Sequence, residues 1–160
     1  MRTSIIPAQR ALSSLRHPDG HQFVGGFRLS RLLGIVVAAG IGPNQAATIE
    51  VRGRKTGRKI SFPVAVVDYG TDRYLVAMLG DRTNWVRNVR ADNHAVLPQG
   101  RRENVSLVED LSGNRAAILR RYLELAPGAR PFFPIDRRAP LDDFEGIVQE
   151  HPVFRVAPAV

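Results

Sequence analysis

The six-residue stretch Gly53–Arg58, with the sequence Gly-Arg-Lys-Thr-Gly-Arg, has the residue types that an anion site needs. Its two glycines can adopt positive φ at little cost, so backbone N–H groups can converge on one anion. Arg54, Lys55 and Arg58 add positive charge, and an arginine can hold a phosphate through two parallel hydrogen bonds. The stretch therefore predicts a site for the phosphate-bearing tail of a ligand.

The residues on both sides of this stretch predict two β-strands. Residues 48–52 and 60–66 alternate between apolar and polar side chains, and a period of two is typical of half-buried strands. The apolar positions are Ile49, Val51, Ile60, Phe62, Val64 and Val66. The basic stretch should therefore be the turn of a β-hairpin.

Other interpretations of this basic turn remain open. It lacks the G-x-x-x-x-G-K-[ST] spacing of a Walker A loop, and no helix opens directly after it, as a dinucleotide fingerprint requires. Residues 52–55 also resemble the short minor-groove arms of architectural DNA-binding proteins, although such arms usually lie in polar tails. A solvated hairpin tip is the simplest alternative. Phosphate binding is the interpretation that we prefer.

A second constellation could border a flat ring. Residues 73–79 are apolar on both faces and predict a central strand, and Gly80 would let a planar group approach the backbone where that strand ends. Trp85 is the only tryptophan, and it lies in the first turn of a predicted helix over residues 84–91 with Thr83 as N-cap. Packing of Trp85 in the core is the alternative.

The remaining pattern predicts an α+β fold, in which a small, mostly antiparallel sheet curls into a barrel flanked by helices. The further expected elements are a helix over 27–39, strands over 95–97 and 103–108, a helix after Ser112, a last helix from Pro140 to about His151, and a closing strand over 153–156. We expect residues 1–26 to form a loosely ordered arm and residues 27–160 to form one domain.

Charge and cysteine content limit the partners. The net charge is +8, and the acids before residue 60 are Asp19 and Glu50, so the basic front half implies an anionic partner. There is no cysteine, which is consistent with the cytoplasm. The apolar run over 32–41 is about half the roughly 20 residues that span a bilayer. Peripheral contact with an anionic membrane surface stays open.

The sequence offers little acid–base or metal chemistry. His17 and His21 are separated by a proline and a glycine that would break a helix, so we expect no metal site. No serine, histidine and acid can be grouped from spacing. Tyr69, Tyr74 and Tyr122 could donate protons, although packing explains them as well.

Three segments in this order resemble the deazaflavin-dependent nitroreductases, which are a branch of the flavin-reductase-like split β-barrels. These segments are 53–58, 74–80 and 84–91, and the tail over 121–155 is similar to the same family. The resemblance implies a split-barrel oxidoreductase that transfers hydride from reduced coenzyme F-420, a deazaflavin whose tail bears a phosphate and glutamates. The acceptor would be an electron-poor small molecule such as a quinone, an activated alkene or a nitroaromatic.

The resemblance also implies roles for individual residues. The phosphate and glutamate tail would be held by Arg54, Lys55, Thr56, Gly57 and Arg58. The ring would be lined by Pro63, Ala77, Met78, Leu79 and Gly80, and its far side would be closed by Asn84, Trp85 and Asn88. Tyr122 is the nearest candidate for the tyrosines that shape the substrate pocket in some relatives.

The chain departs from the better-studied branch at the entry to the helix, where Arg-Thr-Asn-Trp at 82–85 replaces His-Pro-x-Trp. This departure concerns the substrate and the rate more than the cofactor. The alternatives are an FMN-dependent split barrel, a basic nucleic-acid-binding module, and a cofactor carrier without turnover. We expect no nucleic-acid partner, and either a monomer or a homodimer.

Overall fold

The computed structural model describes residues 45–98 and 101–160, and these form a closed barrel of antiparallel strands in the order β1-β2-β3-β6-β5-β4. The strands are β1 (Ala46–Arg52), β2 (Lys59–Tyr69), β3 (Asp72–Val76), β4 (His94–Leu97), β5 (Glu103–Glu109) and β6 (Val153–Pro158). The helices are α2 (Asn84–Ala91), α3 (Arg115–Leu125), the 3-10 helix η1 (Pro127–Phe132) and α4 (Leu141–Glu145). The α+β barrel is confirmed. The predicted helix over 27–39 and the arm over 1–26 lie outside the described residues.

The predicted hairpin is confirmed, with the basic stretch as its turn. Strands β1 and β2 pair in register from Ala46 opposite Ala65 to Arg52 opposite Lys59. Ile49 and Val51 are buried on the barrel side of β1, as the alternation requires. The turn therefore emerges from two strands that the barrel core holds in place.

Strand β3 is apolar on both faces because it separates two apolar clusters. Leu75 faces the barrel interior, while Tyr74 and Val76 face the outer cluster beneath α3. The strand ends at Val76, three residues earlier than expected. The backbone then turns, with the Gly80 N–H donating to the Ala77 carbonyl at 3.0 Å and Gly80 at φ +92°.

Strand β6 closes the barrel, as predicted. It pairs with β3 on one side, where Val153 lies opposite Val76, and with β5 on the other, where Phe154 lies opposite Glu109. The preceding helix is shorter than expected, because α4 ends at Glu145 and the residues that follow form turns, with isolated backbone bonds such as the one from the Ile147 N–H to the Phe144 carbonyl.

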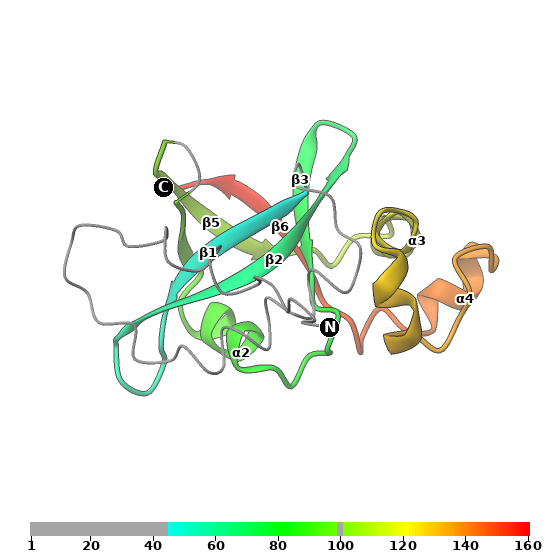
Figure 1. Cartoon of the computed structure of the whole chain (residues 1–160), viewed down its shortest axis with the longest axis horizontal. Helices are drawn as coiled ribbons and strands as arrows, with labels where there is room; N and C mark the ends of the chain where they lie inside the picture. Colours follow the sequence, from blue (N-terminus) through cyan, green and yellow to red (C-terminus); the bar gives the residue numbers. More distant parts are fainter. Residues whose placement is uncertain (1–44, 99–100) are drawn as a thin grey trace, which may run out of the picture.

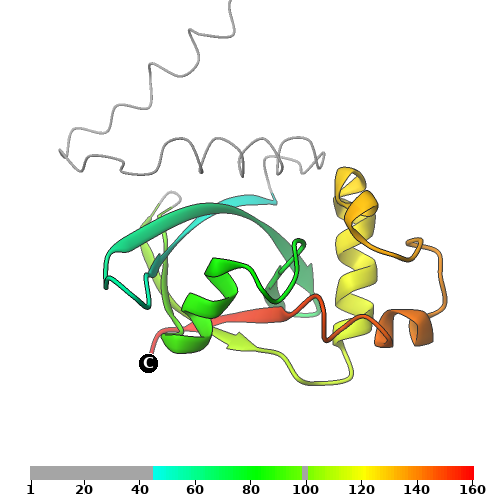
Figure 2. The same ribbon diagram turned by 90° about the horizontal axis from the view of Figure 1, so that it is seen from below.

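The helices lie at two different places on the barrel (Figure 1, Figure 2). Helix α2 crosses one open end, where Val86 and Val89 join the interior cluster, and α3 and α4 pack beside the barrel against the outer cluster. Within the described ranges, no helix is long and apolar enough to cross a membrane. The basic turn and α2 thus lie at the same end of the barrel.

Candidate functional site

The two glycines shape the basic turn in different ways. Gly57 has φ +67°, and its N–H donates to the Gly53 carbonyl at 2.8 Å. Gly53 does not have positive φ, so our expectation for it was wrong. A glycine is required at this position because a side chain has no room there. A Cβ would lie 3.0 Å from Cδ1 of Ile60 and 3.3 Å from the Arg58 carbonyl oxygen. The result is a compact turn that presents its side chains outward.

Asn88 joins this turn to helix α2. Its Oδ1 accepts hydrogen bonds from the Arg54 backbone N–H at 3.2 Å and from Arg54 Nη1 at 2.9 Å. Asn88 is only 3% exposed, so its amide is fixed by packing as well as by these bonds. The structure therefore brings Arg54 and Asn88, both predicted site residues, into direct contact and holds the positive charge of Arg54 over α2.

The other cations of the turn are not engaged in this way. Lys55 and Arg58 are exposed, and their side chains have no hydrogen bond or ion pair to any other described residue. Thr56 Oγ1 accepts the Arg58 backbone N–H at 3.3 Å, which shapes the turn from within. Two positive side chains at this end of the barrel are therefore available to a negatively charged ligand.

Helix α2 contributes a third such cation, which our sequence interpretation did not assign to the site. Arg87 lies one helical turn after Thr83. It is exposed and has no ion pair within the described part of the chain. Arg90 differs, because its guanidinium donates to both carboxylate oxygens of Glu109 at 2.7 and 2.9 Å. Arg90 thus ties α2 to β5, whereas Arg87 stays free for a ligand.

Trp85 lies between the barrel interior and the surface. Its ring centroid is 5.5 Å from that of Phe62 on β2 and 5.3 Å from that of Phe154 on β6. The indole is partly exposed, so it is not sealed in the core, and Asn84 beside it is exposed. Thr83 occupies the predicted N-cap position, but its hydroxyl donates to the Gly80 carbonyl at 3.0 Å instead of capping the helix.

The segment from Ala77 to Gly80 is held by the chain just before β6. The Ala77 N–H donates to the Pro152 carbonyl at 2.9 Å, and the Asp81 N–H donates to the Glu150 carbonyl at 3.0 Å. Ala77 is buried, Met78 is partly buried and Leu79 is 43% exposed. This segment therefore presents apolar side chains from a fixed backbone.

An open pocket of about 520 Å³ borders this segment. Its lining residues are Met78, Leu79, Gly80, Asp81, Arg82, Phe132, Glu150 and His151. Pro63, the remaining predicted ring contact, is partly exposed on β2 opposite Thr48, and it points away from the interior, where Phe62 and Val64 lie. Sequence reasoning missed His151, although its place just before a proline and the closing strand is visible in the sequence.

Tyr122 lies apart from the turn and from Trp85. It is 2% exposed in the outer cluster, with its ring 5.9 Å from that of Phe133, and burial raises the pKa of its hydroxyl. The interior cluster, which contains the contacts of Trp85, is a different one. The structure thus does not group Tyr122 with the other candidate residues.

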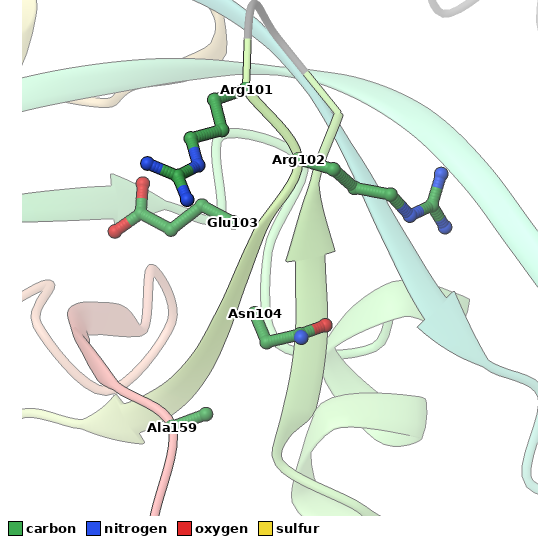
Figure 3. Close-up of a pocket in the computed structure, with 5 residues that line it drawn as sticks. All are labelled: Arg101, Arg102, Glu103, Asn104 and Ala159. Carbon is green, nitrogen blue, oxygen red and sulfur yellow. The ribbon is translucent and has the colours of Figure 1, made fainter.

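A second hollow, shown in Figure 3, does not gather side chains for a ligand. Arg101 and Glu103 point to one side of it, and Arg102 points to the other, toward β1. Arg102 forms an ion pair with Glu50, and Glu103 forms one with Arg73. In residues 45–98 and 101–160, no group of three or more histidine, cysteine or acidic side chains could hold a metal ion.

Comparisons with family models and solved structures show which known proteins the chain resembles. A family model described as F-420H(2)-dependent quinone reductase matches residues 32–129. The solved structure of an F-420-H2 dependent reductase (FDR-A) is similar over 72% of this chain and 96% of its own, with 19% identity and a TM-score of 0.52. A structure described as a domain-swapped dimer is similar over 81% of this chain and 93% of its own, with 18% identity and a TM-score of 0.52. No curated protein sequence matches.

The two structural similarities support the barrel fold, and the family model covers more than half of the chain. The chain belongs to the F-420H(2)-dependent quinone reductase family, and it is an oxidoreductase that uses the deazaflavin coenzyme F-420 to reduce a small electron-poor acceptor.

Proposed function

We propose that the turn over 53–58 binds the acidic tail of coenzyme F-420, and that the segment over 77–80 and Trp85 border its ring, where a quinone is reduced. The observation that carries this proposal is that the basic turn has one cation paired within the protein and two cations without a partner among the described residues. Arg54 is fixed by Asn88, while Lys55 and Arg58 are exposed without partners among the described residues. Cations that a protein does not pair internally are suited to an anionic ligand.

The chemistry of these donors fits the tail of the coenzyme. A phosphate and glutamates bring several negative charges, and the end of the barrel provides Arg54, Lys55, Arg58 and Arg87. The turn is also small enough for close approach, because Gly57 carries no side chain at its exposed apex. Pro63 and Asn84, both accessible, are proposed to contact the ring as the family resemblance implies.

The protein's own contribution is to bind, orient and shield. The coenzyme, when bound, supplies the hydride. Asn88 orients Arg54, and the backbone bonds of Ala77 fix the apolar side chains of Met78 and Leu79 at the pocket. A ring bound against these apolar side chains displaces water from them, which protects the hydride from side reactions.

The proposal also covers the acceptor and the oligomeric state. The name of the family supports a quinone as the acceptor. The similar structure that is described as a domain-swapped dimer supports a dimer in solution. We place the reaction in the cytoplasm, in keeping with a chain that has no cysteine.

The double variant Lys55→Ala/Arg58→Ala tests the tail site. Charge-assisted hydrogen bonds contribute about 1.5–3 kcal/mol when well formed, and solvent exposure reduces this, so we expect coenzyme affinity to fall on the order of 10- to 100-fold. The quenching of Trp85 fluorescence by added coenzyme gives the affinity, since Trp85 is the only tryptophan.

The matched control is Arg121→Ala/Arg138→Ala, which removes two exposed cations from α3 and from the loop before α4. It should leave the affinity unchanged at the same net charge. Equal affinity of the Lys55→Ala/Arg58→Ala variant and the wild type would contradict the tail site. Tighter binding of FMN than of coenzyme F-420 would contradict the cofactor assignment to this site.

A further inference from the structure

His151 is a buried histidine that the proposed function does not yet use. It is 6% exposed, and its ring stacks on that of Phe133 with centroids 4.2 Å apart. Its Nδ1 lies 3.1 Å from the Ala77 carbonyl oxygen. A carbonyl oxygen only accepts hydrogen bonds, so Nδ1 carries a hydrogen and donates it. The orientation of the ring is therefore fixed at both its face and its edge.

The other ring nitrogen of His151 reaches the pocket. Every fully occluded side-chain nitrogen or oxygen in the described part of the chain has a hydrogen-bond partner. Nε2 of His151 has no partner there, so it is not fully occluded. His151 is itself part of the pocket lining, and from its partial accessibility we infer that Nε2 faces this pocket.

The surroundings of Nε2 suit a flat apolar ring that carries oxygen. Met78, Leu79 and Phe132 provide the apolar lining, and the last two are 43% and 46% exposed although they are large apolar side chains. The charged residues that line the same pocket are Asp81, Arg82 and Glu150. A quinone combines a planar apolar ring with carbonyl oxygens that need a hydrogen-bond donor.

We propose that His151 is a catalytic residue whose Nε2 contacts an oxygen of the quinone and delivers a proton to it. The proposal rests on the proposed function, in which the acceptor is reduced beside residues 77–80. Because Nδ1–H is held by Ala77, only the imidazolium has a hydrogen on Nε2. The charged form donates to the quinone carbonyl, and the neutral form accepts the hydroxyl of the product.

Reduction of the quinone to the hydroquinone takes one hydride and one proton. The quinone gains a hydride, with both electrons, from the reduced coenzyme, which is oxidised. One quinone oxygen then carries a negative charge and takes the proton from Nε2, so an N–H bond breaks and an O–H bond forms. The neutral imidazole regains its proton from solvent after the hydroquinone leaves.

Two substitutions separate proton delivery from the structural bond to Ala77. His151→Asn places an amide nitrogen near the position of Nδ1 and has no atom at Nε2, whereas His151→Gln places an amide nitrogen near Nε2 and loses the inner bond. We expect the asparagine variant to lower kcat roughly 100-fold, within the usual range for a general acid. If Nε2 delivers the proton, kcat of the wild type should fall with rising pH and kcat of the asparagine variant should not, while coenzyme affinity stays unchanged.

The glutamine variant should keep the KM for the quinone within about threefold, because an N–H remains at the outer position, and should lose kcat as the asparagine variant does. His94→Gln is the control, since His94 is exposed and bonds to Asp92. If the asparagine variant kept the wild-type kcat and pH profile, His151 would have only a structural role and the proposal would be overturned.

A binding measurement tests the contact without turnover. The Cε1–H signal of His151, assigned by its loss in the asparagine variant, is followed by NMR while 2-methyl-1,4-naphthoquinone is added to wild-type protein, with and without oxidised coenzyme. We expect this signal to shift and the His94 signal to stay. No shift in either form would overturn the proposal. Failure of the tail site would instead appear as unchanged coenzyme affinity in Lys55→Ala/Arg58→Ala.

Discussion

The side-chain carbonyl of Asn88 accepts two hydrogen bonds from Arg54, one from the backbone N–H at 3.2 Å and one from Nη1 at 2.9 Å. One oxygen thus holds both the backbone and the charge of a residue 34 positions away. The turn over 53–58 and helix α2 are thereby coupled. One buried amide on the helix that carries the indole proposed for the ring thus positions Arg54, one of the cations proposed for the tail.

The first prediction concerns this amide. Asn88→Ala leaves the Arg54 N–H and guanidinium without their acceptor, and a lost buried hydrogen-bond partner costs about 1–3 kcal/mol. We expect the free energy of unfolding to fall by that amount in urea titrations. Coenzyme affinity should fall as well, because the turn is no longer held over α2.

The matched control is Asn93→Ala, at an exposed asparagine after α2 whose backbone carbonyl accepts the Leu107 N–H. It should leave stability and affinity within experimental error of the wild type. If Asn88→Ala bound the coenzyme as well as Asn93→Ala did, the amide would not position the site.

The hairpin and helix α2 could be predicted from the sequence because their signals are local. The alternation before and after the basic turn fixed β1 and β2, and the predicted helix over 84–91 has the same bounds as α2. The bond between Arg54 and Asn88 could not be predicted. It depends on closure of the barrel, which brings α2 to the end where the turn emerges.

The contact between His151 and Ala77 also could not be predicted from the sequence, because it too depends on closure of the barrel. Its partner Ala77 is 74 positions away, and the two meet because β3 and β6 are neighbours in the closed barrel. The sequence predicted a last helix from Pro140 to about His151, but α4 ends at Glu145. The side chains of Ile147 and Val148 are buried in the outer cluster from turns, so the predicted helical conformation over these residues was wrong.

The second prediction compares two glycines with positive φ, of which only one lies in the proposed coenzyme site. Gly57 and Gly70 have φ +67° and +62°, and a Cβ on either would meet nothing within 4 Å. Left-handed backbone costs a residue with a side chain about 1–2 kcal/mol, so Gly57→Ala and Gly70→Ala should lose similar stability in urea. Only Gly57→Ala should also weaken coenzyme binding, because only it reshapes the turn between the cations.

Gly113→Ala gives the baseline for this pair, since Gly113 has open space and no positive φ. Equal effects of Gly57→Ala and Gly70→Ala on coenzyme affinity would show that the turn is a solvated tip. An effect of Gly57→Ala on affinity alone, with unchanged stability, would show that the turn takes another backbone conformation at no cost in stability.

The third prediction concerns Tyr122 and alkaline pH. Burial raises the pKa of Tyr122 above the ordinary value of 10.0. The unfolded chain can therefore release this proton above pH 10 while the folded chain keeps it, so stability is full below pH 10 and falls as pH rises beyond it. One such group gives a slope of about 1.4 kcal/mol per pH unit.

Tyr122→Phe removes this contribution, so its unfolding free energy should fall less steeply above pH 10 than that of the wild type. Tyr74, whose pKa is also raised by burial, retains part of the slope in both proteins. Urea unfolding between about pH 8 and pH 11.5 measures the two slopes, with Tyr69→Phe as the control for a partly buried tyrosine of the same cluster. At neutral pH we expect Tyr122→Phe to keep its turnover, because the ring packs against Phe133 away from Trp85. A large loss of kcat at unchanged stability would instead make the hydroxyl of Tyr122 part of the reaction and would compete with His151 for the role of proton donor.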